Sequence, residues 1–504
     1  MTSTEKLGRR TILKQMALVA SSAGLAPALL GAGTATAQTP QAASQTPQAA
    51  AHHDAETAHE TEQLAAYAAA LRYEDLPPAV VQRAKDCIAD TVAAIVYGGE
   101  LPWSKMTVAY AQRTSGTGRS SILGAGGTPV QAGAAALANG AMTHAFELDS
   151  LTKPDSGSHP GATVFTAALA VAQDRGLSGR ELVTALVAGS ETMFRIGHAT
   201  KHTNEARGFH APGTTGPFGA AVAAGHLMGF DAPKMTNALG IAGSCAGGLL
   251  EFAHAGNGAM VKRLHMGRAA EGGVLAASLA ADGFTGPTSV LEGHYGFLRV
   301  FCNDWDVSEL TRGLRTSYFT LDIMLKRYAC HITAHNPVEA VLDLRNEHKF
   351  TAADVASIDI AGNERMAETN NIPAPGDVML AQYSIPFSVA LSLYRDPIDP
   401  RSFDDSAVHD RAILDLAART KLSVVAAQDR RDLAVTVTVR LKDGRAVSRR
   451  VTSFKGTPER PLGRAELREK FLLLTQRLGS DRMAPLFERL QSIENEKALD
   501  WLNV

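Results

Sequence analysis

Hydrophobic residues recur at helical spacing through the first large part of the chain. From about residue 61 to residue 297 they return every three or four positions, and residues 80–95 show this most clearly, ahead of a pair of glycines. That spacing places apolar side chains on one face of an α-helix. Ser178 and Glu181 precede another apolar run and form the signature of a helix N-terminus. Frequent Ala and Gly let helices approach closely. The pattern predicts a densely packed helical domain.

Alternation of apolar and polar residues replaces that spacing after about residue 300. Residues 356–360 and 433–439 alternate in this way, as half-buried strands do. The second run leads to Asp443 and Gly444, a strong signal for a hairpin turn. Helical runs lie between these strands, at residues 336–345 and 386–394. We therefore predict an α+β domain with a small antiparallel sheet, followed by helices that pack back on the first domain.

The N-terminus predicts an export signal. Arg9 and Arg10 are followed by Thr, Ile, Leu and Lys, which resembles a twin-arginine signal, and an Ala-Thr-Ala sequence ends at Ala37. The apolar stretch between them, residues 16–30, is short for a membrane span and is interrupted by Ser, Gly and Pro. We expect cleavage after Ala37 and a periplasmic protein with no stable membrane association.

Five parts of the chain follow from these patterns. The segment after the signal repeats QTPQAA twice and has no apolar period, which predicts a disordered linker. The parts are a signal peptide (1–37), a linker (38–61), a helical domain (62–300), an α+β lid domain (301–460) and C-terminal helices (461–504). The expected fold class is mainly α.

Composition removes several classes of function. The formal net charge of the chain is −2, and no run of Lys and Arg suggests a nucleic-acid groove. The four cysteines are far apart and form no C-x-x-C pair, which argues against a zinc or iron–sulfur site. A glycine-rich stretch at residues 121–129 has Pro129 at the third glycine position of a dinucleotide fingerprint. We therefore expect no metal, no cofactor and no nucleic-acid partner.

Four segments place titratable groups in otherwise apolar surroundings. They read THAFELDSLTKPDSGSHP, RGFHAP, KRLHMGR and KRYACHITAH, and they begin at Thr143, Arg207, Lys262 and Lys326. A single histidine near an Ala-rich helix is usually a hydrogen-bonded core residue, and a Lys-Arg pair at a helix start is usually solvated. Taken together, such clusters of His, Lys and Arg suit a small di- or tricarboxylate.

The ordered set of these segments resembles the MmgE/PrpD family from about residue 65 to residue 501. VVQRAKDCIADTVAAIVYGG is similar to the family's first helix, and ANGAMTHAFELDS with SHPGA is similar to its acidic loop and His-Pro pair. GFHAPGTTGPFGAAVAAGHLMG, KRLHMGRAAEGG and KRYACHITAH follow in the family's order. The resemblance implies a large helical domain, an α+β lid, a cofactor-free site between them and a homodimer.

The resemblance and the chemistry of the side chains together give a set of candidate site residues. Those expected to be catalytic are His159, His265, Glu147, Asp149 and His144. Those expected to bind substrate are Arg207, His210, Lys262, Arg268, Lys326, Tyr328 and His331. His159 is our principal acid–base and His265 a second one, while Glu147 and Asp149 would orient His144 or His159.

Two departures from the family pattern bear on the substrate. Glu147 stands where the family has Asp, and Arg207 stands where a lysine is common. Arg cannot act as a base at ordinary pH but grips carboxylates with two hydrogen bonds. We expect a cofactor-independent lyase that moves a proton α to a carboxylate, by dehydration or decarboxylation. An epimerase or isomerase of a dicarboxylate, or a non-catalytic periplasmic carboxylate-binding protein, stays open as an alternative.

Overall fold

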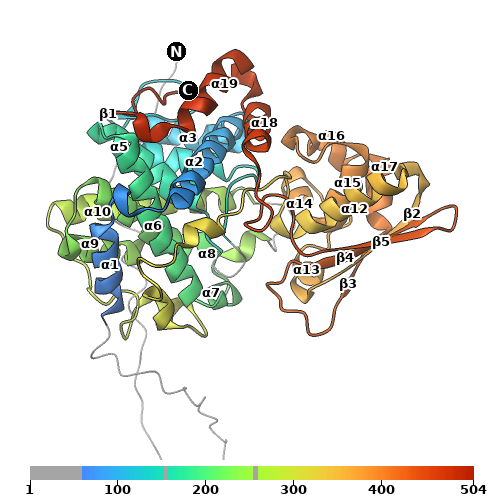
Figure 1. Ribbon diagram of the computed structural model, residues 1–504, viewed down its shortest axis with the longest axis horizontal. Helices are drawn as coiled ribbons and strands as arrows, with labels where there is room; N and C mark the ends of the chain where they lie inside the picture. The colour runs from blue at the N-terminus through green and yellow to red at the C-terminus, as the bar shows by residue number, and fades with distance from the viewer. Residues whose placement is uncertain (1–58, 153–156, 254–258) are drawn as a thin grey trace, which may run out of the picture. The chain divides into compact units, whose positions relative to one another are not determined.

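The computed structural model describes residues 59–152, 157–253 and 259–504, all within one compact unit (Figure 1). The predicted signal peptide and nearly all of the predicted linker lie outside the described residues. The described chain is mainly helical with one four-stranded sheet, so the predicted fold class is confirmed. No helix among the described residues is long and apolar enough to cross a membrane.

Helices make up most of the chain before residue 302. They are α1 (Glu60–Ala70), α2 (Pro78–Gly98), α3 (Pro102–Thr114), α4 (Ala132–Thr143), α5 (Thr166–Arg175), α6 (Gly179–Ala199), α7 (Thr203–Ala206), α8 (Ala211–Leu227), α9 (Ala232–Ala242), α10 (Val261–Ala281) and α11 (Phe297–Phe301). A short strand, β1 (Thr117–Ser120), interrupts them. The first helix begins inside the range expected to be linker, and Thr61 is fully buried. The capping box at Ser178 and Glu181 opens α6 as predicted.

Small residues set the spacing of the central helices. Helix α10 packs against both α4 and α8. A Cβ atom on Gly267 of α10 would lie 2.3 Å from the carbonyl oxygen of Leu137 in α4, and one on Gly273 would lie 2.3 Å from the Cβ of Ala220 in α8. Neither distance is tolerated by a real side chain, so these glycines are required for the close approach. The approach matters for function because α4 and α10 both carry site residues.

A second region combines helices with the sheet. Its helices are α12 (His335–His348), α13 (Glu364–Thr369), α14 (Val378–Tyr383), α15 (Ile385–Tyr394), α16 (Asp405–Val408) and α17 (Arg411–Ala418). Its strands are β2 (Val355–Gly362), β3 (Thr420–Val424), β4 (Val435–Leu441) and β5 (Ala446–Val451), in the order β3-β2-β4-β5. The predicted hairpin at Asp443 and Gly444 joins β4 to β5, and Gly444 takes the left-handed φ of 92°.

The sheet is mixed, so the prediction of an antiparallel sheet is wrong for one of its three strand pairs. Strand β2 pairs antiparallel with β4 but parallel with β3. The chain between β2 and β3 passes through five helices, a connection long enough to return β3 in the same direction as β2. Helix α12 packs against β4 and β5, where Val435, Val437 and Val439 are buried.

The last part of the chain returns to the helical region. Helix α18 (Arg464–Leu474) packs against α2 and against α19 (Ser480–Leu490), as the red and blue ribbons show in Figure 1. Further on, the side-chain amide of Gln173 in α5 donates hydrogen bonds to the carbonyl oxygens of Leu499 and Leu502. The end of the chain is therefore part of the packing around the first helices.

Candidate active site

The acidic loop begins where α4 ends. His144 caps the helix, and Glu147 takes a left-handed conformation with a φ of 52°, which a residue with a Cβ adopts only when its surroundings hold it there. Two donors fix the backbone just before it: the half-buried Trp103 indole and the buried Arg263 guanidinium both donate to the carbonyl oxygen of Ala145, at 3.1 and 3.3 Å. These contacts hold the backbone of the loop in a conformation in which its acidic side chains point inward.

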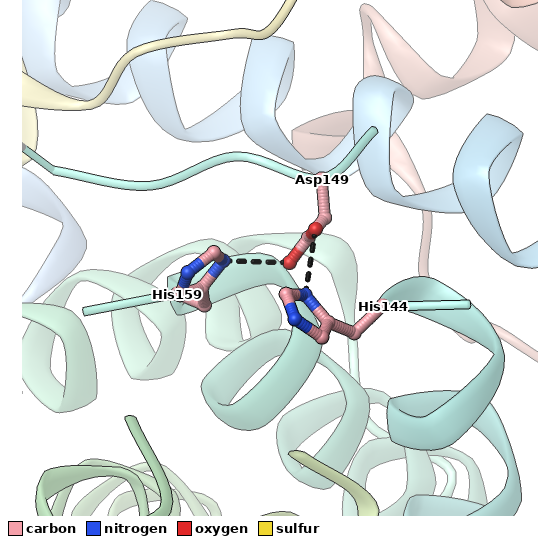
Figure 2. A group of neighbouring side chains, drawn as sticks. All are labelled: His144, Asp149 and His159. Carbon is pink, nitrogen blue, oxygen red and sulfur yellow. Dashed lines mark hydrogen bonds and ion pairs between the residues drawn. The ribbon is translucent and has the colours of Figure 1, made fainter. Parts of the chain in front are cut away.

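Asp149 joins two histidines of this loop (Figure 2). One of its carboxylate oxygens lies 2.9 Å from Nδ1 of His144, and the other lies 2.8 Å from Nδ1 of His159. All three residues are buried. Since a carboxylate only accepts, each Nδ1 carries the hydrogen, and each Nε2 is left to accept or donate a proton. Among the described residues, Nε2 of His144 has no hydrogen-bond partner.

Electrostatics separate the roles of the three groups. Burial would raise the pKa of Asp149, but the two histidines outweigh it and hold that pKa well below its usual value, so Asp149 stays ionised. Burial lowers the pKa of His144 to about 4, against the opposing pull of Asp149. His144 is therefore neutral at pH 7. The pair of imidazoles around one carboxylate suits proton transfer from fixed ring positions.

Two lysines that are far apart in the sequence both contact Glu147. Lys262 of α10 contacts one oxygen of the Glu147 carboxylate, and Nζ of Lys326, from the segment before α12, lies 2.8 Å from the other. Burial opposes ionisation of Glu147, yet the two ammonium groups hold its pKa well below the usual value. Burial lowers the pKa of Lys262 to about 8, partly offset by Glu147, whereas Glu147 and Asp149 raise the pKa of Lys326 despite its burial. Lys262 is thus the lysine that titrates near neutral pH.

Two further histidines meet beside this cluster. Nδ1 of His210 lies 3.1 Å from Nδ1 of His265, so one ring must donate and the other accept. The His210 ring centroid is 6.4 Å from that of His144. Burial and the nearby Lys262 charge keep the pKa of both His210 and His265 below the usual value. His265 is half-buried and does not line the cavity described next.

A cavity of about 760 Å³ is lined by several of these groups. Its charged and polar lining comes from the helical region and from the α+β region alike. From the former come Glu147, His159, His202, Glu205, His210 and Lys262, and from the latter come Lys326, His331, Arg365 and Tyr383. The His331 and Tyr383 rings stack with centroids 4.8 Å apart, and Nζ of Lys262 lies 4.6 Å from the Tyr383 ring centroid. Two segments far apart in sequence thus build one polar cavity.

Three of the predicted substrate-binding residues do not line the cavity, and their role in binding substrate stays a prediction. Arg268 is exposed and pairs with Glu271, because six positions along α10 turn it about 240° away from Lys262. Arg207 ends α7 with an exposed side chain. Tyr328 is buried against His335 and lines a different cavity, next to α12.

Sequence reasoning missed a link between the two regions. Glu205 accepts from Arg365 at 3.1 Å, and the same oxygen lies 3.1 Å from Nδ1 of His202. These side chains and Tyr383 line the cavity. The spacing of His202 and Glu205, three residues apart among polar neighbours, was the available signal; nothing in the sequence near Arg365 or Tyr383 indicated a site.

The group of His144, Asp149 and His159 also has the composition of a metal site. Their potential ligand atoms lie within 4.8 Å of one another. In the described structure both Nδ1 atoms instead donate to the Asp149 oxygens, and those hydrogen bonds account for the close approach. The expected absence of a metal stays a prediction, which a chelator tests.

The structure combines a helical region with a smaller α+β region. Histidines around a carboxylate lie close to buried lysines. These features define a two-domain protein with an acid–base site for anions. The chain belongs to the MmgE/PrpD family: residues 62–310 match the family's N-terminal domain and residues 328–491 its C-terminal domain. The resemblance noted in the sequence is thereby confirmed.

Several relatives are named cis-aconitate decarboxylase. The Aspergillus terreus enzyme is 32% identical over 303 residues, a match that covers 57% of this chain and only 60% of that protein. A cis-aconitate decarboxylase-like protein of Aspergillus oryzae is 28% identical over 86% of this chain and 93% of its own length. The human cis-aconitate decarboxylase is 27% identical over 86% of this chain and 92% of its own length. These relatives support an enzyme of the lyase type at the level of the family.

Proposed function

We propose that the protein is a cofactor-independent lyase acting on a small di- or tricarboxylate, by decarboxylation or dehydration. The observation that carries the proposal is the placement of Asp149, whose two oxygens hold the Nδ1 atoms of His144 and His159. Of these three residues, His159 lines a cavity that buried lysines line as well. The names and coverage of the relatives support the same class of reaction.

The chemistry follows from what each group offers. In a decarboxylation the bond between a carbon and its carboxylate breaks, carbon dioxide leaves, and the electron pair stays on the carbon until a proton arrives. Nε2 of His159 supplies that proton, because Asp149 fixes the ring and stabilises its protonated form. In a dehydration the same nitrogen removes the α-proton and hydroxide leaves. Both reactions develop negative charge, which Lys262 and Lys326 stabilise.

Substrate charge is set by the cations around the cavity. Lys262 and Lys326 share the single carboxylate of Glu147, which leaves one of their two positive charges uncompensated, whereas Arg365 is paired with Glu205. A substrate carboxylate therefore has to compete with a protein carboxylate at each cation. A ligand with two or three carboxylates gains enough contacts to do so, whereas a monocarboxylate does not.

The test is a substrate screen by proton NMR. Purified protein is incubated with cis-aconitate, citrate, 2-methylcitrate and aspartate-derived dicarboxylic acids, in water and in deuterium oxide. We expect loss of carbon dioxide or water from one tricarboxylate, with solvent deuterium at the carbon that receives the proton. Interconversion of stereoisomers without loss of any group would instead establish an epimerase.

A non-catalytic carboxylate-binding protein is the second candidate. Glu147 favours it, because this one side chain pairs with both lysines that a substrate carboxylate would need. Thermal stabilisation by several carboxylates without turnover of any would establish that function and refute the lyase.

We further propose that the protein acts as a homodimer after export to the periplasm. Four apolar side chains at the start of α10 and in the segment before it are exposed. They are Leu249, Met260, Val261 and Leu264. A second copy of the chain would remove them from water. Light scattering that gives twice the mass of one mature chain supports the dimer, and a single-chain mass refutes it.

A further inference from the structure

A buried lysine from the far end of the chain contacts the acidic loop from behind. Nζ of Lys470, in α18, lies 2.5 Å from an oxygen of Asp90 in α2 and donates to the carbonyl oxygen of Leu148 at 3.0 Å. Both side chains are buried, and neither residue lines the cavity. The ammonium group of Lys470 therefore contacts the backbone of the loop, and Lys470 does not line the cavity.

The carbonyl that Lys470 holds lies between the two acidic residues of the site. Leu148 follows Glu147, whose left-handed φ of 52° requires support, and precedes Asp149. Fixing this peptide group restrains the backbone from which the Asp149 side chain leaves. Helix α2 adds a second contact on the other side of Asp149, because Sγ of Cys87 lies 3.3 Å from Oγ of Ser150.

Stability alone does not explain this arrangement. A buried ion pair contributes little net stability, because two charges must be removed from water. The second oxygen of Asp90 has no hydrogen-bond partner among the described residues, which adds to that cost. The ammonium group is the one feature of the pair that reaches the loop.

We propose that Lys470, held in place by Asp90, is a positioning residue that aligns Asp149 with His144 and His159. The proposal rests on the function proposed above, in which these three residues transfer a proton to or from the substrate. The C-terminal helix α18 thereby becomes part of the catalytic apparatus without touching the substrate.

Two double variants of nearly equal size test the proposal. Asp90→Asn/Lys470→Gln keeps an N–H donor for the Leu148 carbonyl, whereas Asp90→Asn/Lys470→Met has none. Neither leaves a buried charge unpaired. A matched control is Lys85→Met/Glu494→Gln, which removes another ion pair between α2 and the C-terminal part of the chain without contact to the loop.

We expect the Gln variant to retain a kcat about 10-fold or more above that of the Met variant, since a small displacement of a catalytic group costs up to about 100-fold. Their melting temperatures should agree within about 4 °C. The control should keep the wild-type kcat. Equal kcat values for the Gln and Met variants would overturn the proposal. If the double variants do not fold, Lys470→Gln and Lys470→Met are compared with Asp90 unchanged.

A measurement without substrate separates this proposal from the proposed function. In protein labelled with ¹⁵N-histidine, the Nδ1 protons that bind Asp149 should give downfield NMR resonances. These resonances should persist in the Gln variant and shift or vanish in the Met variant. That result supports positioning by Lys470 even if no carboxylate is turned over, whereas unchanged resonances in both variants would refute it.

Discussion

Replacing Asp149 by Asn removes one negative charge from the centre of the site and exchanges one of its two acceptor oxygens for a donor amide. The wild-type oxygens accept from His144 at 2.9 Å and from His159 at 2.8 Å. An amide can accept from only one of these rings. The other ring faces a donor and must adopt the opposite tautomer, in which its Nε2 is protonated and is no longer a base.

The size of the effect follows from these two contacts. A hydrogen bond to a charged group contributes about 1.5–3 kcal/mol, and both bonds in this site lose their charge. Only the bond to His159 is made by the ring that carries the transferred proton. The loss of about 1.5–3 kcal/mol in stabilisation of the protonated histidine corresponds to a fall in kcat of about 10–10²-fold. KM should change much less, because Asp149 does not line the cavity and makes no direct contact with substrate.

Initial rates over a range of cis-aconitate or other accepted substrate, measured by NMR, give kcat and KM for wild type and Asp149→Asn. Glu191→Gln is the matched control, because Glu191 is a fully buried carboxylate paired with Arg195 and Thr320 outside the cavity. It should lower the melting temperature while leaving kcat near wild type. If Asp149→Asn behaved as this control does, the acid–base role of the three residues would be wrong.

Four further results are expected. His159→Ala should lower kcat by at least about 10²-fold with little change in melting temperature, as circular dichroism can check; loss of stability with normal turnover would show a core role instead. The value of kcat/KM should fall as pH rises through about 8, because Lys262 then loses its charge, and Lys262→Met should abolish that limb of the pH profile. EDTA should leave activity unchanged, and a loss restored by a divalent ion would establish a metal at the histidines. Replacing Arg9 and Arg10 by Lys should leave unprocessed precursor in the cytoplasm, which immunoblotting of cell fractions would detect.

Local pattern was sufficient for much of the fold. The helical spacing of residues 80–95, the capping box at Ser178 and the Asp443-Gly444 turn each depend on contacts between residues close in sequence. The structure confirms all three. The parallel pairing of β2 with β3 depends instead on where a chain of intervening helices returns, which no local pattern specifies.

By itself the sequence determined the family and the fold class, because the motifs and the helical spacing that indicate them depend on residues close together in the chain. It identified Asp149, His144 and His159 within one short loop, where the chain itself keeps them close. Only the tertiary structure decided which distant residues join them. It placed Arg365 at the cavity and turned Arg268 away from it, since helix phase and domain packing, not residue type, set the direction of a side chain.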